Sequence, residues 1–184
     1  MSTRWSAKYV IGLTGNIATG KSVVRKMLEH LGAFGIDADA LSHQAIGKGG
    51  PGYAAVVDHF GKWLLDPDGQ INRAKLGRIV FADPGALALL EGIIPPLVSQ
   101  GIDFLAKRTQ SSVVVIEAIK LLESGLARDC DAVWTVHEVA GTRFDRLIPD
   151  EPATATGDDE PRLVVDFVDV PTGRALMSRH VLLH

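Results

Sequence analysis

The sequence predicts an α/β fold in which a parallel sheet of about five strands carries helices on both faces. Residues 9–13 form a short apolar run, followed within about thirty residues by a Gly-rich turn, a helical pattern and a second apolar run, which is the order of a βαβ unit. Residues 112–116 (SVVVI) lack polar alternation, as expected of a strand buried on both faces of a parallel sheet. A chain of 184 residues favours one domain, with room for a small inserted subdomain.

The remaining elements follow from periodicity and from turn residues. Apolar residues recur at helical spacing over residues 22–31, residues 33–36 form a second strand candidate, and residues 132–136 a further one. Residues 40–108 have mostly helical patterns broken by turns at KGGPG and DPDG, so we expect a helical subdomain there. Asp83 and Pro84 are expected to cap and begin one of its helices. Pro95 and Pro96 are expected to interrupt a helix or to begin a new one.

Composition excludes several classes of protein. The formal net charge of −3 gives no general reason to expect a nucleic-acid partner or a basic membrane-contacting face. No run of about eighteen apolar residues occurs, so no transmembrane helix is expected. The single cysteine, Cys130, excludes an internal disulfide, fits a reducing cytoplasm and is expected to be a small buried apolar residue. We therefore expect a cytoplasmic protein without a nucleic-acid or membrane partner. A monomer is a further expectation, which the composition does not decide.

One motif carries specific chemistry. Residues 15–22 (GNIATGKS) match GxxxxGK[ST] at every specified position, after a predicted strand and at the start of a predicted helix. Glycines let main-chain N–H groups approach phosphates, the lysine binds the β- and γ-phosphates, and the serine hydroxyl binds Mg²⁺. The motif predicts a P-loop NTPase-type three-layer fold that binds the phosphates of a nucleoside triphosphate, which we expect to be ATP, together with Mg²⁺. A Gly-rich turn that binds nothing remains an alternative. The nucleotide-binding residues would be Gly15, Asn16, Ile17, Ala18, Thr19, Gly20, Lys21 and Ser22.

Three acidic residues follow predicted strands, at the edge of the sheet where ligands of α/β proteins bind. Asp37 and Asp39 come after the second strand and could accept a proton from a substrate hydroxyl or hold Mg²⁺ through water. Asp39 could equally cap a helix that begins near Ala40. Glu117 follows the SVVVI strand, and either contacts the water shell of the metal or is a solvated loop residue.

The sequence resembles the dephospho-coenzyme A kinases over residues 9–148. IGLTGNIATGKS followed by LGAFGIDADALSHQ is similar to the start of that family. FGKWLLDPDGQINRAKLGRIVFADP at residues 60–84, VVVIEAIKLLESGL at residues 113–126 and CDAVWTV at residues 130–136 are similar to later segments, in the same order. The DAD triplet and the middle segment are more specific than the P-loop, because other small P-loop kinases lack them.

This resemblance implies ATP-dependent phosphorylation of the ribose 3′-hydroxyl of dephospho-coenzyme A, the last step of coenzyme A biosynthesis. It implies that Asp39 is the general base and that Asp37 supports the substrate site. Lys21 would be catalytic through its contact with the phosphates, and Ser22 would be the metal ligand. Residues of about 40–108 would hold the acceptor, with Arg73 at a basic position of that family segment.

The C-terminal part departs from the family pattern. We expect residues 1–148 to form the kinase domain, and residues 149–184 to be a divergent tail that is either disordered or altered by a shift of the reading frame. In that tail, residues 162–170 are a strand candidate, and residues 174–184 a short helix or a frayed end. The family's lid arginine has no counterpart after Ile148, which points to one alternative, a catalytically impaired nucleotide-binding remnant. A kinase for another small hydroxyl acceptor is the second alternative that stays open.

Overall fold

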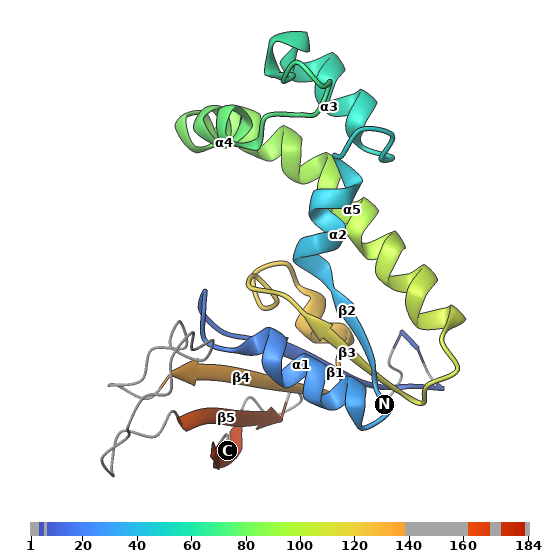
Figure 1. Ribbon diagram of the computed structural model, residues 1–184, viewed down its shortest axis with the longest axis vertical. Coiled ribbons are helices and arrows are strands. Elements are labelled where there is room, and N and C mark those ends of the chain that lie inside the picture. Colours follow the sequence, from blue (N-terminus) through green and yellow to red (C-terminus); the bar gives the residue numbers. More distant parts are fainter. Residues whose placement is uncertain (1–3, 6, 139–161, 170–173, 183–184) are drawn as a thin grey trace, which may run out of the picture. The chain divides into compact units, whose positions relative to one another are not determined.

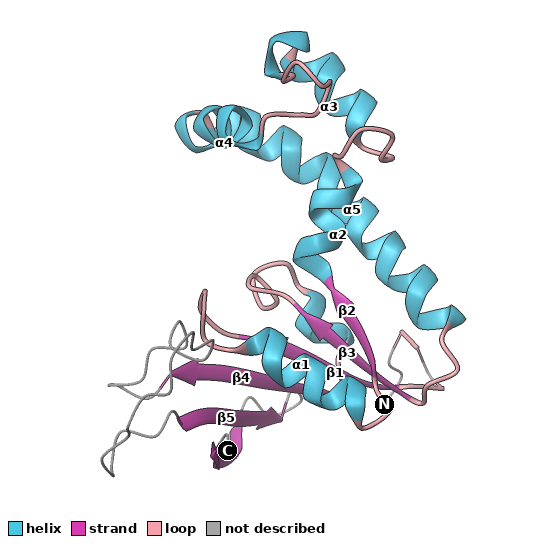
Figure 2. Ribbon diagram, viewed as in Figure 1, coloured by secondary structure: helices cyan, strands magenta, loops and turns pink. Residues whose placement is uncertain are grey.

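The computed structural model describes residues 4–5, 7–138, 162–169 and 174–182. The chain divides into two compact units, residues 1–37 with 109–184 and residues 38–108, which we call the sheet unit and the helical unit. Figure 2 shows the strands of the first unit and the helices α2 to α5 of the second.

The sheet unit contains one six-stranded sheet in the order β2-β3-β1-β4-β5-β6. Strands β2, β3, β1 and β4 are parallel, whereas β5 and β6 are antiparallel to their neighbours. The predicted α/β fold with a parallel sheet is therefore confirmed, with four parallel strands where about five were expected. The bounds are β1 (Tyr9–Thr14), β2 (Phe34–Asp37), β3 (Val113–Glu117), β4 (Ala132–Glu138), β5 (Arg162–Asp169) and β6 (Arg174–Leu182).

Helix α1 (Lys21–His30) covers one face of the sheet (Figure 1). Its inward residue Val24 is buried in a cluster with alternate residues of the central strands, and Leu28 packs against the same cluster. Burial of this apolar stripe fixes the helix on the sheet, because helical spacing places both residues on one face. The sheet side of the cluster is formed by Ile11, Leu13, Val115 and Val136.

The opposite face of β1 is covered by a loop and the short 3-10 helix η2 (Leu126–Asp129). Gly12 points to that side, because successive residues of a strand face opposite sides of a sheet. A Cβ atom at Gly12 would lie 2.7 Å from Leu121 Cδ2 and 2.9 Å from Cys130 Sγ, so the loop packs directly against the backbone of β1. Within the described sheet unit, α1 therefore packs on one side of β1 and this loop, with η2, on the other.

Cys130 is expected to be chemically inert in the folded protein. It is buried, and burial together with the nearby charges of Asp129 and Asp131 raises the pKa of its thiol to about 12 from an ordinary value of 9.0. Because only the thiolate reacts, the folded protein carries on the order of a thousandfold less reactive sulfur than a free cysteine at the same pH. A thiol-specific chromophoric reagent should therefore label Cys130 rapidly in denaturant and very slowly without it. Rapid labelling of the native protein would contradict the burial of Cys130.

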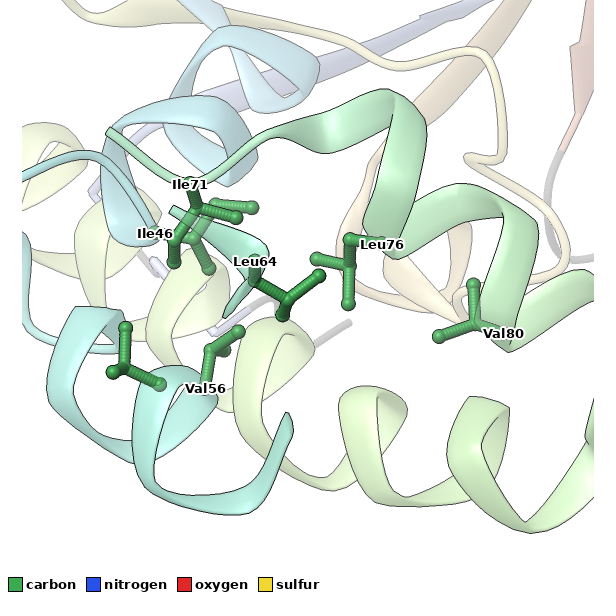
Figure 3. Close-up of a cluster of buried hydrophobic side chains, with 7 residues drawn as sticks. Ile46, Val56, Leu64, Ile71, Leu76 and Val80 are labelled. Atoms are coloured by element: carbon green, nitrogen blue, oxygen red, sulfur yellow. The ribbon is translucent and has the colours of Figure 1, made fainter. Parts of the chain in front are cut away.

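The helical unit has its own hydrophobic core. Buried side chains of Ile46, Val56, Leu64, Leu76 and Val80 converge from several of its elements (Figure 3). A separate core makes this unit a distinct packing element. Its bounds are α2 (Ala38–Ala45), α3 (Tyr53–Phe60), the 3-10 helix η1 (Lys62–Leu64), α4 (Arg73–Ala82) and α5 (Pro84–Arg108).

Helix α5 begins as predicted but does not stop at its two prolines. The Asp83 side chain accepts a hydrogen bond of 2.8 Å from the backbone N–H of Gly85, and Pro84 is the first helical residue. The expectation that Pro95 and Pro96 interrupt the helix or begin a new one is wrong, since both lie inside this 25-residue helix. The prolines remove two backbone donors, and packing against α2, α3 and α4 supports the rest of the helix.

By length and composition, α5 is also the one helix of the described ranges that a membrane could accommodate. A single helix of this kind is weak evidence for a membrane segment, because long helices of soluble proteins meet the same criterion. The expectation of no transmembrane helix therefore stays a prediction.

Two segments of the expected tail are strands. β5 occupies the predicted strand position and pairs with β4 from Val133 opposite Val168 to Glu138 opposite Leu163. β6 lies where a short helix or a frayed end was expected, so the helical alternative is wrong for Arg174–Leu182. Residues 139–161, which include the expected end of the kinase domain, lie outside the described residues.

Candidate nucleotide-binding site

Residues 15–22 connect the end of β1 to the start of α1 and form a loop that only particular backbone conformations allow. Gly15 has a φ of 144° and Gly20 a φ of 90°, both in the left-handed region that side chains disfavour. A Cβ atom at Gly15 would collide with the carbonyl oxygen of Val136 in β4. Ala18 also has a positive φ, 64°, which is uncommon for a residue with a side chain and often marks a functional loop. The loop therefore has the tight geometry that brings main-chain N–H groups toward a phosphate.

Lys21 and Thr19 hold this loop together from inside. The Lys21 Nζ donates a hydrogen bond of 2.6 Å to the carbonyl oxygen of Asn16, and the Thr19 hydroxyl donates one of 2.9 Å to the same oxygen. Lys21 is only 6% exposed, so the loop surrounds its ammonium group. An ammonium in this position can exchange the carbonyl for phosphate oxygens of a nucleotide.

Ser22, Glu117 and Arg25 form a hydrogen-bonded chain at the start of α1. The Ser22 hydroxyl donates to Glu117 Oε1 at 2.8 Å, and Arg25 Nε donates to Glu117 Oε2 at 2.6 Å. The expectation that Glu117 is a solvated loop residue is wrong, because Glu117 is the last residue of β3 and is 6% exposed. Its partner Ser22 is exposed, so the hydroxyl remains accessible to a ligand. This arrangement is compatible with the other expectation, in which Glu117 reaches the water shell of a metal.

The charge of Arg25 is secured by two carboxylates. Its Nη1 donates a second hydrogen bond, of 2.6 Å, to Glu29 Oε1. Burial lowers the pKa of Arg25, but the hydrogen bonds and charges of Glu117 and Glu29 outweigh that effect and raise the pKa above its ordinary value. The guanidinium therefore stays charged and hydrogen-bonded at every physiological pH.

Asp37 and Asp39 lie in different elements. Asp37 ends β2 and is paired in register with Glu117, which places both at the carboxyl edge of the sheet. Asp39 lies in the first turn of α2, which begins at Ala38, so it is inside the helix and does not precede it as a cap. Both side chains are partly exposed.

Arg73 is the first residue of α4 and lines a small pocket of the helical unit. Within the described part of the chain, its guanidinium forms no hydrogen bond or ion pair. Two other cations of the helical unit have partners: Lys75 Nζ donates to Trp63 O at 3.3 Å, and Arg108 lies 5.3 Å from the centre of the Phe104 ring. The pocket has a volume of about 280 Å³ and is lined by His43, Gln44, Ile46, Gly47, Gln70, Ile71 and Arg73.

Sequence reasoning missed Arg25. The available signal was its spacing from Ser22, because residues three apart share one face of a helix. That spacing alone could not identify the carboxylate that meets this face, since Glu117 is 92 residues further along the chain.

A parallel sheet with a GxxxxGKS loop between its central strand and the following helix defines a P-loop protein that binds nucleotide phosphates. The family model for dephospho-CoA kinase matches residues 9–160. The chain belongs to the dephospho-CoA kinase family, which is a family of phosphotransferases.

Individual relatives agree with this assignment. The dephospho-CoA kinase of Moorella thermoacetica is 38% identical over 178 residues, covering 90% of this chain and 84% of that protein. The enzyme of Geobacter metallireducens is 43% identical over 161 residues, covering 86% of this chain and 80% of that protein. The enzyme of Streptomyces avermitilis is 45% identical over 139 residues, covering 75% of this chain and 68% of that protein.

Solved structures show the same fold. The crystal structure of TT1252 from Thermus thermophilus superposes with a TM-score of 0.60 at 28% identity, covering 68% of this chain and 63% of that one. Dephospho-CoA kinase from Campylobacter jejuni gives a TM-score of 0.50 at 28% identity, covering 64% of this chain and 60% of that one. The match thus spans less than two thirds of each of these two solved chains.

Proposed function

We propose that this chain transfers the γ-phosphoryl group of ATP to the ribose 3′-hydroxyl of dephospho-coenzyme A, the last step of coenzyme A biosynthesis. The observation that carries the proposal is the loop of residues 15–22, with Lys21 inside it, in a chain of the dephospho-CoA kinase family. The bacterial relatives and the single buried cysteine favour a cytoplasmic enzyme. We expect a monomer whose only partner in the reaction is its small-molecule substrate.

Magnesium fits the residues at the start of α1. Ser22 and Glu117 place a hydroxyl and a carboxylate oxygen 2.8 Å apart, and Mg²⁺ prefers hard oxygen ligands supplied by one or two protein groups, phosphates and water. Within the described residues, no cluster of three or more His, Cys, Asp or Glu offers an all-protein metal site, which agrees with this sparse mode of binding. Ser22 would be the direct ligand, and the bound ion would neutralise charge on the phosphates.

The chain's own residues would perform three tasks. Main-chain N–H groups of residues 15–22 and the ammonium of Lys21 would hold the β- and γ-phosphates and stabilise charge that develops on the transferred group. Asp39, supported by Asp37, would accept the proton of the 3′-hydroxyl as that oxygen attacks the γ-phosphorus. The bond from the γ-phosphorus to the β,γ-bridging oxygen breaks, and ADP leaves with its electron pair.

Arg73 would bind a phosphate group of the acceptor. Its guanidinium has five donors without partners among the described residues, and it borders a pocket of about 280 Å³ with His43 and Gln70. Replacing Arg73 by Ala should raise the KM for dephospho-coenzyme A by about tenfold or more, because a hydrogen bond to a charged group contributes about 1.5 to 3 kcal/mol. The KM for ATP should not change.

Steady-state kinetics with each substrate varied in turn checks this expectation. Lys62→Ala is a suitable control, since Lys62 is an exposed cation of the same unit whose side chain has no hydrogen bond or ion pair among the described residues. An equal KM for the acceptor in Arg73→Ala and the wild type would remove Arg73 from the acceptor site.

An acceptor panel distinguishes the proposed function from its alternatives. The protein is incubated with ATP, Mg²⁺ and one of dephospho-coenzyme A, adenosine, AMP or pantetheine, and ADP release is recorded. We expect release above the ATPase background with dephospho-coenzyme A alone. Preferred release with another acceptor would favour a different small-molecule kinase, and ATP binding without any turnover would favour an impaired nucleotide-binding remnant.

A further inference from the structure

We propose that Arg25 is a positioning residue of the magnesium-dependent nucleotide site, where it fixes the carboxylate of Glu117 so that its second oxygen faces Ser22. The inference deepens the proposed function and rests on its nucleotide site, but it does not depend on the identity of the acceptor.

The contacts at Glu117 divide its two oxygens between two partners. Arg25 Nε lies 2.6 Å from Oε2, and the Ser22 hydroxyl lies 2.8 Å from Oε1. A carboxylate held at one oxygen can still rotate about its last side-chain bond, whereas one held at both oxygens cannot. The side chains of Arg25 and Glu117 are only 17% and 7% exposed, so little water is available to compete for this pair.

Arg25 is itself held from the opposite side. Its Nη1 contacts Glu29, one helical turn further along α1, at 2.6 Å. The Arg25–Glu29 pair lies over Gly35 of β2, where an added Cβ atom would be 3.0 Å from Arg25 Cγ and 2.8 Å from Glu29 Cδ. The absence of a side chain at Gly35 leaves the space that this pair occupies. The guanidinium is therefore held by two carboxylates, and the rest of the Arg25 side chain packs against Gly35.

This support matters for magnesium because Mg²⁺ demands near-ideal octahedral geometry. Groups that orient metal-binding residues typically contribute about 10- to 100-fold to metal affinity. Loss of Arg25 also removes a positive charge near the ion, and that change by itself would strengthen Mg²⁺ binding. The two effects have opposite signs, so the direction of the change tests whether positioning is the function of Arg25.

Calorimetric titration of ADP, with saturating Mg²⁺ and separately with a chelator, measures how much magnesium tightens nucleotide binding. In Arg25→Met we expect this tightening to fall by about 10-fold or more, while the affinity for metal-free ADP stays within about twofold of the wild type. Arg25→Lys keeps the charge but lacks the planar fork, and it should recover part of the tightening. Lys26→Met, which removes an exposed charge on the same helix, should behave as the wild type.

The proposal would be overturned if Mg²⁺ increased the ADP affinity of folded Arg25→Met as much as that of the wild type, or more. It would also be overturned if the variant lost the same factor of ADP affinity with and without Mg²⁺. If Arg25→Met does not fold, as judged by thermal unfolding, Arg25→Lys decides: tightening equal to the wild type refutes a role for the planar guanidinium. The measurement needs no acceptor. A wild type that binds Mg-ADP but does not phosphorylate dephospho-coenzyme A would therefore refute the proposed function and leave this inference standing.

Discussion

Replacing Asp39 by Asn should lower kcat with dephospho-coenzyme A by on the order of 10²- to 10⁴-fold, the contribution typical of a general acid or base. The amide has nearly the same shape as the carboxylate but cannot accept the proton of the attacking hydroxyl. The KM for ATP should change little, because the phosphates would be held by residues 15–22 and not by α2. Single-turnover phosphoryl transfer, followed by quenching and separation of the products, measures the chemical step directly.

A matched control separates this effect from a general perturbation of the helical unit. Asp58→Asn changes the same functional group at an exposed position of α3, and its side chain forms no hydrogen bond or ion pair within the described part of the chain. It should have wild-type kcat. If Asp39→Asn retained wild-type single-turnover rates, Asp39 would not be the base.

Replacing Lys21 by Ala should lower kcat by on the order of 10²- to 10³-fold, which is the usual loss when one preorganised group that stabilises transition-state charge is removed. The variant should also bind ATP more weakly. Because Lys21 Nζ donates to Asn16 O inside the loop, its removal leaves that carbonyl with the Thr19 hydroxyl as its remaining side-chain partner, and the loop loses part of its support. Steady-state kinetics and calorimetric ATP titration together measure both losses.

Lys26→Ala provides the comparison for Lys21→Ala, since Lys26 is an exposed cation of the same helix whose side chain has no hydrogen bond or ion pair among the described residues. Its activity and ATP affinity should equal those of the wild type. Wild-type kcat and ATP affinity in Lys21→Ala would mean that the loop does not hold the triphosphate.

Local signals in the sequence predicted the sheet unit well. The strand expected at residues 9–13 is β1 (Tyr9–Thr14), and the helix expected at residues 22–31 is α1 (Lys21–His30), because apolar periodicity and glycine positions act locally. The loop between them was expected at residues 15–22 because its backbone requires glycines at fixed positions, whereas the positive φ of Ala18 was not expected. The binding of nucleotide by these residues remains a prediction. The roles of Asp37, Asp39 and Arg73 were inferred from the family resemblance and remain predictions.

Features that depend on distant partners could not be predicted. β6 contains Ala, Leu, Met and Arg, which favour helices, yet pairing with β5 places it in the sheet. Pro95 and Pro96 locally oppose a helix, but the packing of α5 against its neighbours outweighs that tendency. The Arg25–Glu117 pair joins a helix to a strand far away in the sequence, so no local pattern could reveal it.

The most direct test of the central claim is identification of the phosphorylated product by ³¹P NMR after incubation of the wild-type chain with ATP, Mg²⁺ and dephospho-coenzyme A. We predict a new phosphomonoester signal at the ribose 3′ position, formed in equal amount to ADP. ADP formation without that signal, or neither product despite a folded protein that binds Mg-ATP, would contradict the assignment of this chain as an active dephospho-coenzyme A kinase.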